Sequence, residues 1–169
     1  MCSCPKNTIC PLDGKCLTKS VIYNAEIVVT GRKNLNRYET KKLRILEEEN
    51  RKKNEIFKPK EKEFYTGLTK NTIKDRIYKH HYDCNHREFE KRTALSKYIW
   101  KLKDNFYNYK INWRILSIAK AYNPATKSCN LCTKEKYYII FKPNLATLNE
   151  NNELLKKCRH RYNWIIENN

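Results

Sequence analysis

Residues 21–29 read Val21-Ile22-Tyr23-Asn24-Ala25-Glu26-Ile27-Val28-Val29, and this stretch decides the class of fold. Apolar side chains occupy every second position and several are β-branched, which is typical of a β-strand. Two further strands are predicted, over residues 63–67, where we expect the strand to end at Gly67, and over 109–115. The chain therefore supplies a small sheet, with its first two strands predicted to form a hairpin.

Helical spacing of apolar residues predicts helices over 71–82, 93–104, 130–141 and 151–167. Thr69 or Asn71 can cap the first of them. Three strands and four helices predict an α+β fold. We expect a small three-stranded, mainly antiparallel sheet flanked by about four helices.

Composition divides the chain into two parts. Residues 1–19 are cysteine-rich and predict a zinc-knuckle-like segment, and residues 20–169 form the main domain. Residues 31–62 are dominated by charges and interrupt the predicted hairpin. This insertion is either a solvated helix, from Arg37 to Lys53, or a disordered loop.

Charge points to the kind of partner. The chain has 36 Lys and Arg against 18 Asp and Glu, a formal net charge of +18. Such a balance favours a polyanion, with nucleic acid before an anionic membrane face, although a merely soluble basic protein is the alternative. No membrane-crossing helix is expected, because no stretch of about 18 residues is apolar and uncharged.

Eight cysteines are many for 169 residues. No secretion signal opens the sequence, so we expect an intracellular protein, nuclear if DNA is its substrate. In a reducing compartment, clustered cysteines indicate metal more often than disulfides. A secreted cysteine-rich interaction protein is the alternative. The candidate zinc ligands make either two tetrahedral zinc sites or one site that draws on both groups of ligands. The groups are Cys2, Cys4, Cys10 and Cys16, then Cys129, Cys132, Cys158 and His160.

A candidate phosphate site lies on the first predicted helix. Arg76 and His80 share one helix face, and Tyr65 precedes that helix. Arginine binds phosphate in a fork, and tyrosine or histidine can move a proton. The alternative is that Arg76 and His80 are solvated and Tyr65 packs in the core. Glu135 falls in an apolar stripe, where either a divalent metal or an ion pair with a neighbouring lysine would satisfy it.

The chain carries, in this order, Tyr23, Tyr65, Arg76, His80, Glu135 and Asn149. This ordered set resembles the GIY-YIG nuclease superfamily. Five stretches more closely resemble the endonuclease domain of Penelope-type eukaryotic retroelements. They are residues 2–17, 67–69, 95–103, 129–132 and 158–161. The chain departs from the family at Val21, where the first motif has glycine, and at Thr66, where the second has isoleucine or valine.

The resemblance implies a metal-dependent DNA endonuclease that leaves a 5′-phosphate and a 3′-hydroxyl. It implies duplex DNA as substrate and a reverse transcriptase domain or protein as partner. Glu135 would hold Mg²⁺ or Mn²⁺, and Tyr23 or Tyr65 would act on the attacking water. Arg76 would stabilise the phosphate, His80 would assist proton transfer, and Asn149 would support the site. The alternative, motivated by Val21 and the insertion, is a catalytically decayed, zinc-stabilised nucleic-acid-binding module.

Overall fold

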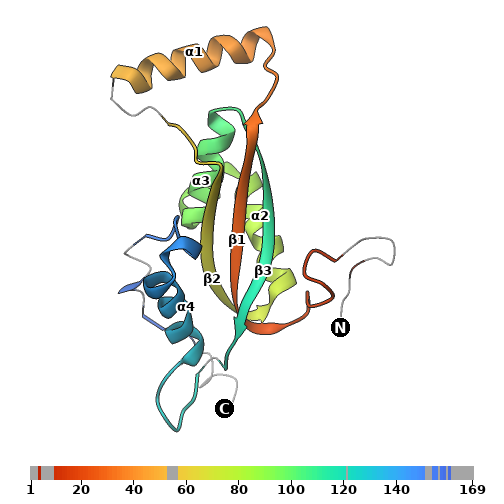
Figure 1. The fold of residues 1–169 in the computed structure, drawn as a ribbon, viewed down its shortest axis with the longest axis vertical. Helices are drawn as coiled ribbons and strands as arrows, with labels where there is room; N and C mark the ends of the chain where they lie inside the picture. The colour runs from red at the N-terminus through yellow and green to blue at the C-terminus, as the bar shows by residue number, and fades with distance from the viewer. Residues whose placement is uncertain are drawn as a thin grey trace.

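Three antiparallel strands form one sheet in the order β2-β1-β3, as expected (Figure 1). The structure is a computed structural model, and it describes residues 4, 10–52, 57–120, 122–150, 154, 155, 157, 158 and 160. The strands are β1 (Lys19–Arg32), β2 (Lys62–Thr72) and β3 (Tyr107–Ile118). Buried apolar residues follow one another along β1 because this central strand is covered on both faces.

Helices cover the sheet, which confirms the α+β class. Helix α2 (Ile73–Asn85) and helix α3 (Ala94–Asp104) lie behind the sheet in Figure 1, and the 3₁₀ helix η1 (Arg87–Arg92) joins them. Tyr23 and Ile27 of β1 share a buried cluster with Leu95 and Ile99 of α3. A second cluster joins Ile22 to Leu131 of α4 (Asn130–Phe141). Neighbouring residues of β1 thus pack into different layers.

The charged insertion contains helix α1 (Arg37–Lys52), at the end of the β1–β2 hairpin (Figure 1). Its first turn carries a capping box, in which Asn36 Oδ1 accepts from Glu39 N at 2.8 Å and Asn36 N donates to Glu39 Oε2 at 3.0 Å. Such a cap supplies partners for helix-end groups and favours the helix over the disordered alternative. Leu43 is buried, but most of this helix is exposed.

The second strand is longer than predicted. It runs through Gly67 to Thr72, and Thr72, rather than Thr69 or Asn71, caps α2 by accepting from Asp75 N. Gly67 is therefore not a strand terminator. Helix α3 begins after a capping box between Thr93 and Ser96, close to its predicted start, and α4 has its predicted bounds.

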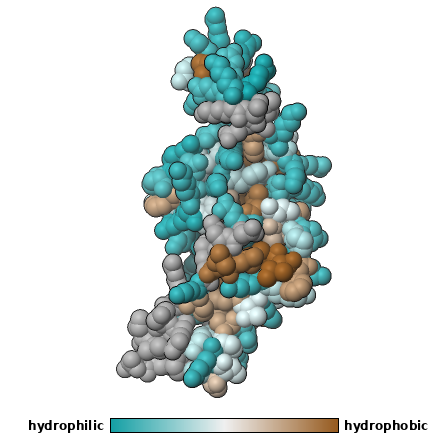
Figure 2. All heavy atoms as spheres, turned by 90° about the vertical axis from the view of Figure 1, so that its left-hand side faces the viewer, coloured by the Kyte–Doolittle hydropathy of each residue, from teal (hydrophilic) through white to brown (hydrophobic). Residues whose placement is uncertain are grey.

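The last predicted helix, over 151–167, falls almost entirely outside the described residues. Before it, α4 and the 3₁₀ helix η2 (Pro143–Leu145) lie beside β2. Figure 2 shows this side of the molecule, where apolar side chains gather between hydrophilic surfaces. Ile140 and Phe141 of α4 are exposed large apolar side chains. No described helix is long and apolar enough to cross a membrane.

Candidate functional site

Tyr23, Arg76 and His80 meet between β1 and α2. Arg76 Nε donates to the Tyr23 hydroxyl at 2.8 Å, and the same hydroxyl lies 2.7 Å from Nε2 of His80. Tyr23 and His80 are 0% and 1% exposed, whereas Arg76 is half-buried. The buried Tyr23 therefore holds Arg76 through its hydroxyl, and the buried His80 holds that hydroxyl in place. The alternative is therefore wrong for Arg76 and His80, which are not merely solvated, but right for Tyr65, which packs in the core at 4% exposure.

Electrostatics keep the imidazole neutral beside a charged guanidinium. Burial, followed by the positive charge of Arg76, holds the pKa of His80 well below its ordinary value. Burial opposes the charge of Arg76, but its interactions with Tyr23 and Tyr65 outweigh burial and raise its pKa. Because Arg76 donates to the Tyr23 oxygen, the Tyr23 O–H is free to donate to Nε2 of a neutral His80. Nδ1 of His80 is buried and has no hydrogen-bond partner among the described residues.

Tyr65 and Gly67 complete this side of the sheet. The ring of Tyr65 meets the ring of His80 edge to face at 5.8 Å, and Trp113 stacks on His80 at 5.5 Å. Gly67 is the register partner of Tyr23, and a Cβ atom at Gly67 would stand 2.5 Å from the Tyr23 hydroxyl. The aromatic rings and the absence of a side chain at position 67 together fix where the hydroxyl can lie.

Asn149 and Asn24 support β2. The Asn149 amide pairs with the backbone of Thr66, accepting from its N at 2.9 Å and donating to its O at 2.8 Å. Asn24 is fully buried, and its Nδ2 contacts Tyr65 O, Thr66 Oγ1 and Leu145 O. Thr66, which stands where the resembling family has isoleucine or valine, donates its hydroxyl to Leu145 O at 2.7 Å.

Asn24 did not enter the sequence-based set of site residues. Its signal was present, because a buried asparagine in an apolar strand must find partners for its amide. Its Oδ1 accepts from Arg114 Nε at 3.1 Å, so this one side chain links all three strands. The departure at Thr66 is therefore part of a local hydrogen-bonded set.

Glu135 stands half-buried on α4. Its helix packs on the sheet through Leu131, in the cluster of Ile22, whereas Tyr23 belongs to the cluster of α2 and α3. The close contacts of the tyrosine–arginine–histidine group are made between α2 and the three strands. The carboxylate thus comes from a separate layer of the fold.

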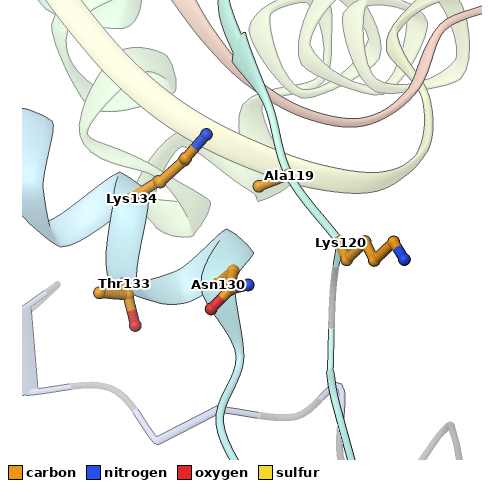
Figure 3. A pocket seen from close by; sticks show the side chains of 5 residues that line it. All are labelled: Ala119, Lys120, Asn130, Thr133 and Lys134. Atoms are coloured by element: carbon orange, nitrogen blue, oxygen red, sulfur yellow. The ribbon is translucent and has the colours of Figure 1, made fainter.

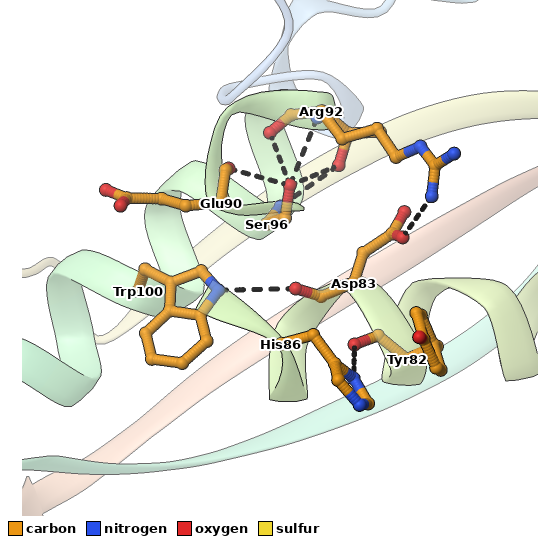
Figure 4. A network of polar contacts seen from close by, with 8 residues as sticks. Tyr82, Asp83, His86, Glu90, Arg92, Ser96 and Trp100 are labelled. Carbon is orange, nitrogen blue, oxygen red and sulfur yellow. Dashed lines mark hydrogen bonds and ion pairs between the residues drawn. The ribbon is translucent and has the colours of Figure 1, made fainter. Parts of the chain in front are cut away.

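The end of α2 is tied to η1 and α3 by a polar network (Figure 4). Asp83 Oδ1 accepts from Arg92 Nη1 at 2.8 Å, and the Asp83 carbonyl accepts from Trp100 Nε1 at 3.2 Å. Asp83 is fully buried, so its ion pair with Arg92 replaces solvation that the carboxylate has lost. This network fixes the C-terminal end of α2, the helix that carries Arg76 and His80.

One metal-ligating group lies at the start of α4. His160 Nδ1 is 3.3 Å from the sulfurs of Cys129 and Cys132 and 3.7 Å from that of Cys158. A tetrahedral zinc site, with Zn–S about 2.3 Å and Zn–N about 2.0–2.1 Å, separates sulfur and nitrogen by about 3.6 Å. Burial raises the pKa of the Cys132 thiol, so an ion would have to displace its proton. These four residues could hold a zinc-like ion.

A second group brings together Cys4, Cys10 and Cys16, whose sulfurs lie within 4.8 Å of one another. The Cys4 and Cys16 sulfurs are 4.0 Å apart, against about 3.8 Å for two sulfurs of a tetrahedral zinc site. This group could also hold a zinc-like ion, while Cys2 lies outside the described residues. No described cysteine takes part in a disulfide, so the sulfurs of both groups could serve as metal ligands.

An open pocket of about 330 Å³ lies between the end of β3 and the start of α4 (Figure 3). It is lined by Ala119, Lys120, Asn130, Thr133 and Lys134. Lys134 Nζ donates to the Ile118 carbonyl at 3.1 Å, and the two lysine side chains point in different directions. The lysines therefore do not converge on one ligand.

No protein-family model matches this chain, and neither the curated proteins nor the solved structures contain a significant match.

Proposed function

We propose that the protein is a metal-dependent DNA endonuclease of the GIY-YIG type, the nicking domain of a Penelope-type retroelement. The observation that carries the proposal is the group in which Tyr23 joins Arg76 to His80. The ordered set of residues named by the resemblance supports it, as does the three-stranded antiparallel sheet. A net charge of +18 suits a phosphate-rich substrate.

The proposed roles follow from burial and hydrogen bonding. Arg76 binds the scissile phosphate, since Nε is held by Tyr23 and the terminal nitrogens of the guanidinium can donate to phosphate oxygens. Tyr23, whose hydroxyl joins Arg76 to His80, is the tyrosine in direct contact with the phosphate-binding arginine and is assigned to orienting the attacking water. His80 assists by accepting a hydrogen bond from the Tyr23 hydroxyl at Nε2. Tyr65 packs against His80 and fixes its ring.

Asn149 maintains β2 in this scheme, because its amide engages both backbone groups of Thr66, beside Tyr65 and Gly67. Glu135 would hold one Mg²⁺ or Mn²⁺, hard cations that accept a single carboxylate together with phosphate oxygens. Such an ion neutralises charge on the phosphate when it is bound. Hydrolysis in this scheme leaves a 5′-phosphate and a 3′-hydroxyl that a reverse transcriptase domain or protein could extend.

Two structural Zn²⁺ sites belong to the same proposal. Cys129, Cys132, Cys158 and His160 form one donor set, and Cys4, Cys10 and Cys16 form the other. Cys2, which lies outside the described residues, is the sequence-based candidate for its fourth ligand. Thiolate and imidazole donors favour Zn²⁺ over Mg²⁺, so the structural and catalytic ions would not compete for one site. Action on chromosomal DNA would place the protein in the nucleus.

Plasmid nicking tests the proposal. Wild type, Glu135→Ala and Arg76→Ala are compared in Mg²⁺ and in Mn²⁺, with Glu49→Ala and Arg44→Ala, exposed on α1, as matched controls. We expect nicking by wild type and both controls, and at least a hundredfold loss in the two site variants. Nicking by all five proteins would contradict the assigned site.

A zinc-stabilised binding module is the second candidate, favoured by the burial of Tyr23 and His80 and by Val21 in place of glycine. Duplex DNA binding by wild type and Glu135→Ala, with no nicking by either in any metal, would establish it. The endonuclease proposal would then be wrong.

A further inference from the structure

The N-terminal thiol group is built by a tight turn. Asp13 and Gly14 adopt positive φ angles of 49° and 80°, and Lys15 N donates to Leu12 O at 2.8 Å. The chain reverses there, so Cys10 and Cys16 approach each other from the two arms of the turn and Cys4 joins them. Leu12 and Cys16 are buried in the same cluster as Tyr23 and Ile73. The cysteine group is therefore anchored on the sheet and the start of α2.

The same segment also holds the first turn of α2 through its backbone. The Cys16 carbonyl accepts from Lys74 N at 3.0 Å, and the Thr18 carbonyl accepts from Ile73 N at 3.0 Å. A helix leaves its first N–H groups without partners inside the helix, so an outside acceptor fixes where the helix begins. Two of the earliest donors of α2 thus depend on the chain that immediately follows the cysteines.

Arg76 follows Lys74 by two residues in the same helical turn. Its bond to Tyr23, at 2.8 Å, leaves little tolerance for a shift, because hydrogen bonds weaken steeply as length and angle depart from their optimum. The far end of α2 is held separately, by Asp83 with Arg92 and Trp100. The near end has Thr72 as its side-chain cap and the Cys16 and Thr18 carbonyls as backbone acceptors.

We propose that Zn²⁺ bound by Cys4, Cys10 and Cys16 positions Arg76, by holding the Cys16 carbonyl against the first turn of α2. The inference rests on the proposed function for its effect on DNA cleavage, whereas its structural part does not. The three sulfurs lie within 4.8 Å of one another, close enough to bind a single ion, and sulfur donors suit Zn²⁺. Losing the ion would release the Cys10–Cys16 turn and, with it, the acceptors of the Ile73 and Lys74 amides.

Amide hydrogen exchange, read residue by residue by NMR, tests the inference without any nuclease assay. Wild type is loaded with Zn²⁺ and compared with Cys10→Ser and with Cys132→Ser, which removes a ligand of the other thiol group. In Cys10→Ser we expect one Zn²⁺ fewer per chain and at least tenfold faster exchange of the Lys74 amide. Exchange of the Ile99 amide, inside α3, should stay within twofold of wild type.

The matched variant separates this role from general stabilisation. Cys132→Ser should also lose one Zn²⁺ but leave Lys74 exchange within twofold of wild type. Unchanged Lys74 exchange in Cys10→Ser, or equal acceleration in both variants, would overturn the inference. Should Cys10→Ser fail to fold, Cys10→His, which keeps a zinc ligand, is measured in its place with and without Zn²⁺. Its Lys74 exchange must then slow at least tenfold on loading.

Activity is read separately. If the proposed function holds, Cys10→Ser should nick plasmid at least tenfold more slowly than Cys132→Ser. If Lys74 exchange accelerates in Cys10→Ser while the wild type nicks no DNA, the positioning role stands and only the nuclease function is rejected.

Discussion

Gly67 lies against the hydroxyl of Tyr23, so closely that a Cβ atom there would stand 2.5 Å from the Tyr23 oxygen. The two residues are register partners in β2 and β1. The same hydroxyl receives Arg76 Nε and contacts His80 Nε2. A missing side chain in one strand thus sets the position of the arginine on the following helix.

Gly67→Ala should separate Tyr23 from Arg76 and His80. A carbon and an oxygen that are not bonded clash at 2.5 Å, and overpacking of this kind costs about 1–3 kcal/mol of stability. We expect that loss in urea unfolding and at least a tenfold slower nicking rate. Gly31→Ala is the control, because Gly31 has an open surrounding and a φ of +113°. It should lower stability through backbone strain while nicking persists, and equal losses of nicking would contradict the steric explanation.

His80 should make stability depend on pH. Burial and the positive charge of Arg76 hold the pKa of His80 in the folded protein well below its ordinary value, whereas the unfolded chain takes up a proton near pH 6.5. The unfolded state then binds more protons, so stability is lost as pH falls below about 6.5, by up to about 1.4 kcal/mol per unit for one group.

Unfolding free energies at pH 7.5, 6.5 and 5.5 measure this loss. His80→Gln should flatten the slope, while His81→Gln, at an exposed neighbour whose pKa burial lowers less, should change it little. An identical slope in His80→Gln and wild type would show that His80 is not the titrating group.

The types of the main elements followed from the sequence, but the ends of β2 did not. Alternation of apolar residues identifies β1, and helical spacing identifies α3 and α4. Gly67 resembled a strand terminator because glycine is unfavourable inside strands in general. Glycine stands at position 67 because the hydroxyl of Tyr23, from the neighbouring strand, leaves no room for a side chain. The sequence around Gly67 does not contain this long-range contact.

The candidate site also combines residues that local sequence spacing links and residues that only the tertiary structure brings together. Arg76 and His80 were linked in advance by their i, i+4 spacing on one helix face. Tyr23, far away in the chain, was linked to them by resemblance alone, since its contact depends on how α2 packs on β1. Asn24 and Thr66 were missed as partners because the Leu145 carbonyl that joins them comes from a distant loop.

Asn149→Ala should loosen β2. The amide of Asn149 makes two hydrogen bonds to Thr66, each contributing about 0.5–1.5 kcal/mol. We expect a loss of about 1–3 kcal/mol in urea unfolding. Thr147→Ala is the graded control. Thr147 Oγ1 also makes two hydrogen bonds, accepting from Phe64 N at 2.8 Å and donating to Phe64 O at 3.3 Å, but both are exposed and the second is long, so its loss should cost less. A larger loss in Thr147→Ala would reverse the order that the contacts predict.

Cys158→Ser should remove one Zn²⁺ per chain and lower the unfolding temperature. Its sulfur lies with Cys129, Cys132 and His160 in one donor set. Cys84→Ser is the control, since Cys84 belongs to neither described group and burial raises its pKa to about 11. Metal analysis after dialysis provides the measurement. Equal zinc content in Cys158→Ser and wild type would exclude Cys158 as a ligand.

Because β1 is the central strand, the sheet is complete only when β3, the last strand in the sequence, has been synthesised. Tyr23 pairs with Gly67 on one side and with Ile115 on the other. During synthesis, Tyr23, Arg76 and His80 all leave the ribosome before β3 does, and Trp113, which stacks on His80, is among the last of these residues to emerge. A nascent chain that stops short of β3 therefore contains the tyrosine, arginine and histidine without the assembled cluster. Such a chain lacks both the third strand and the indole that stacks on His80.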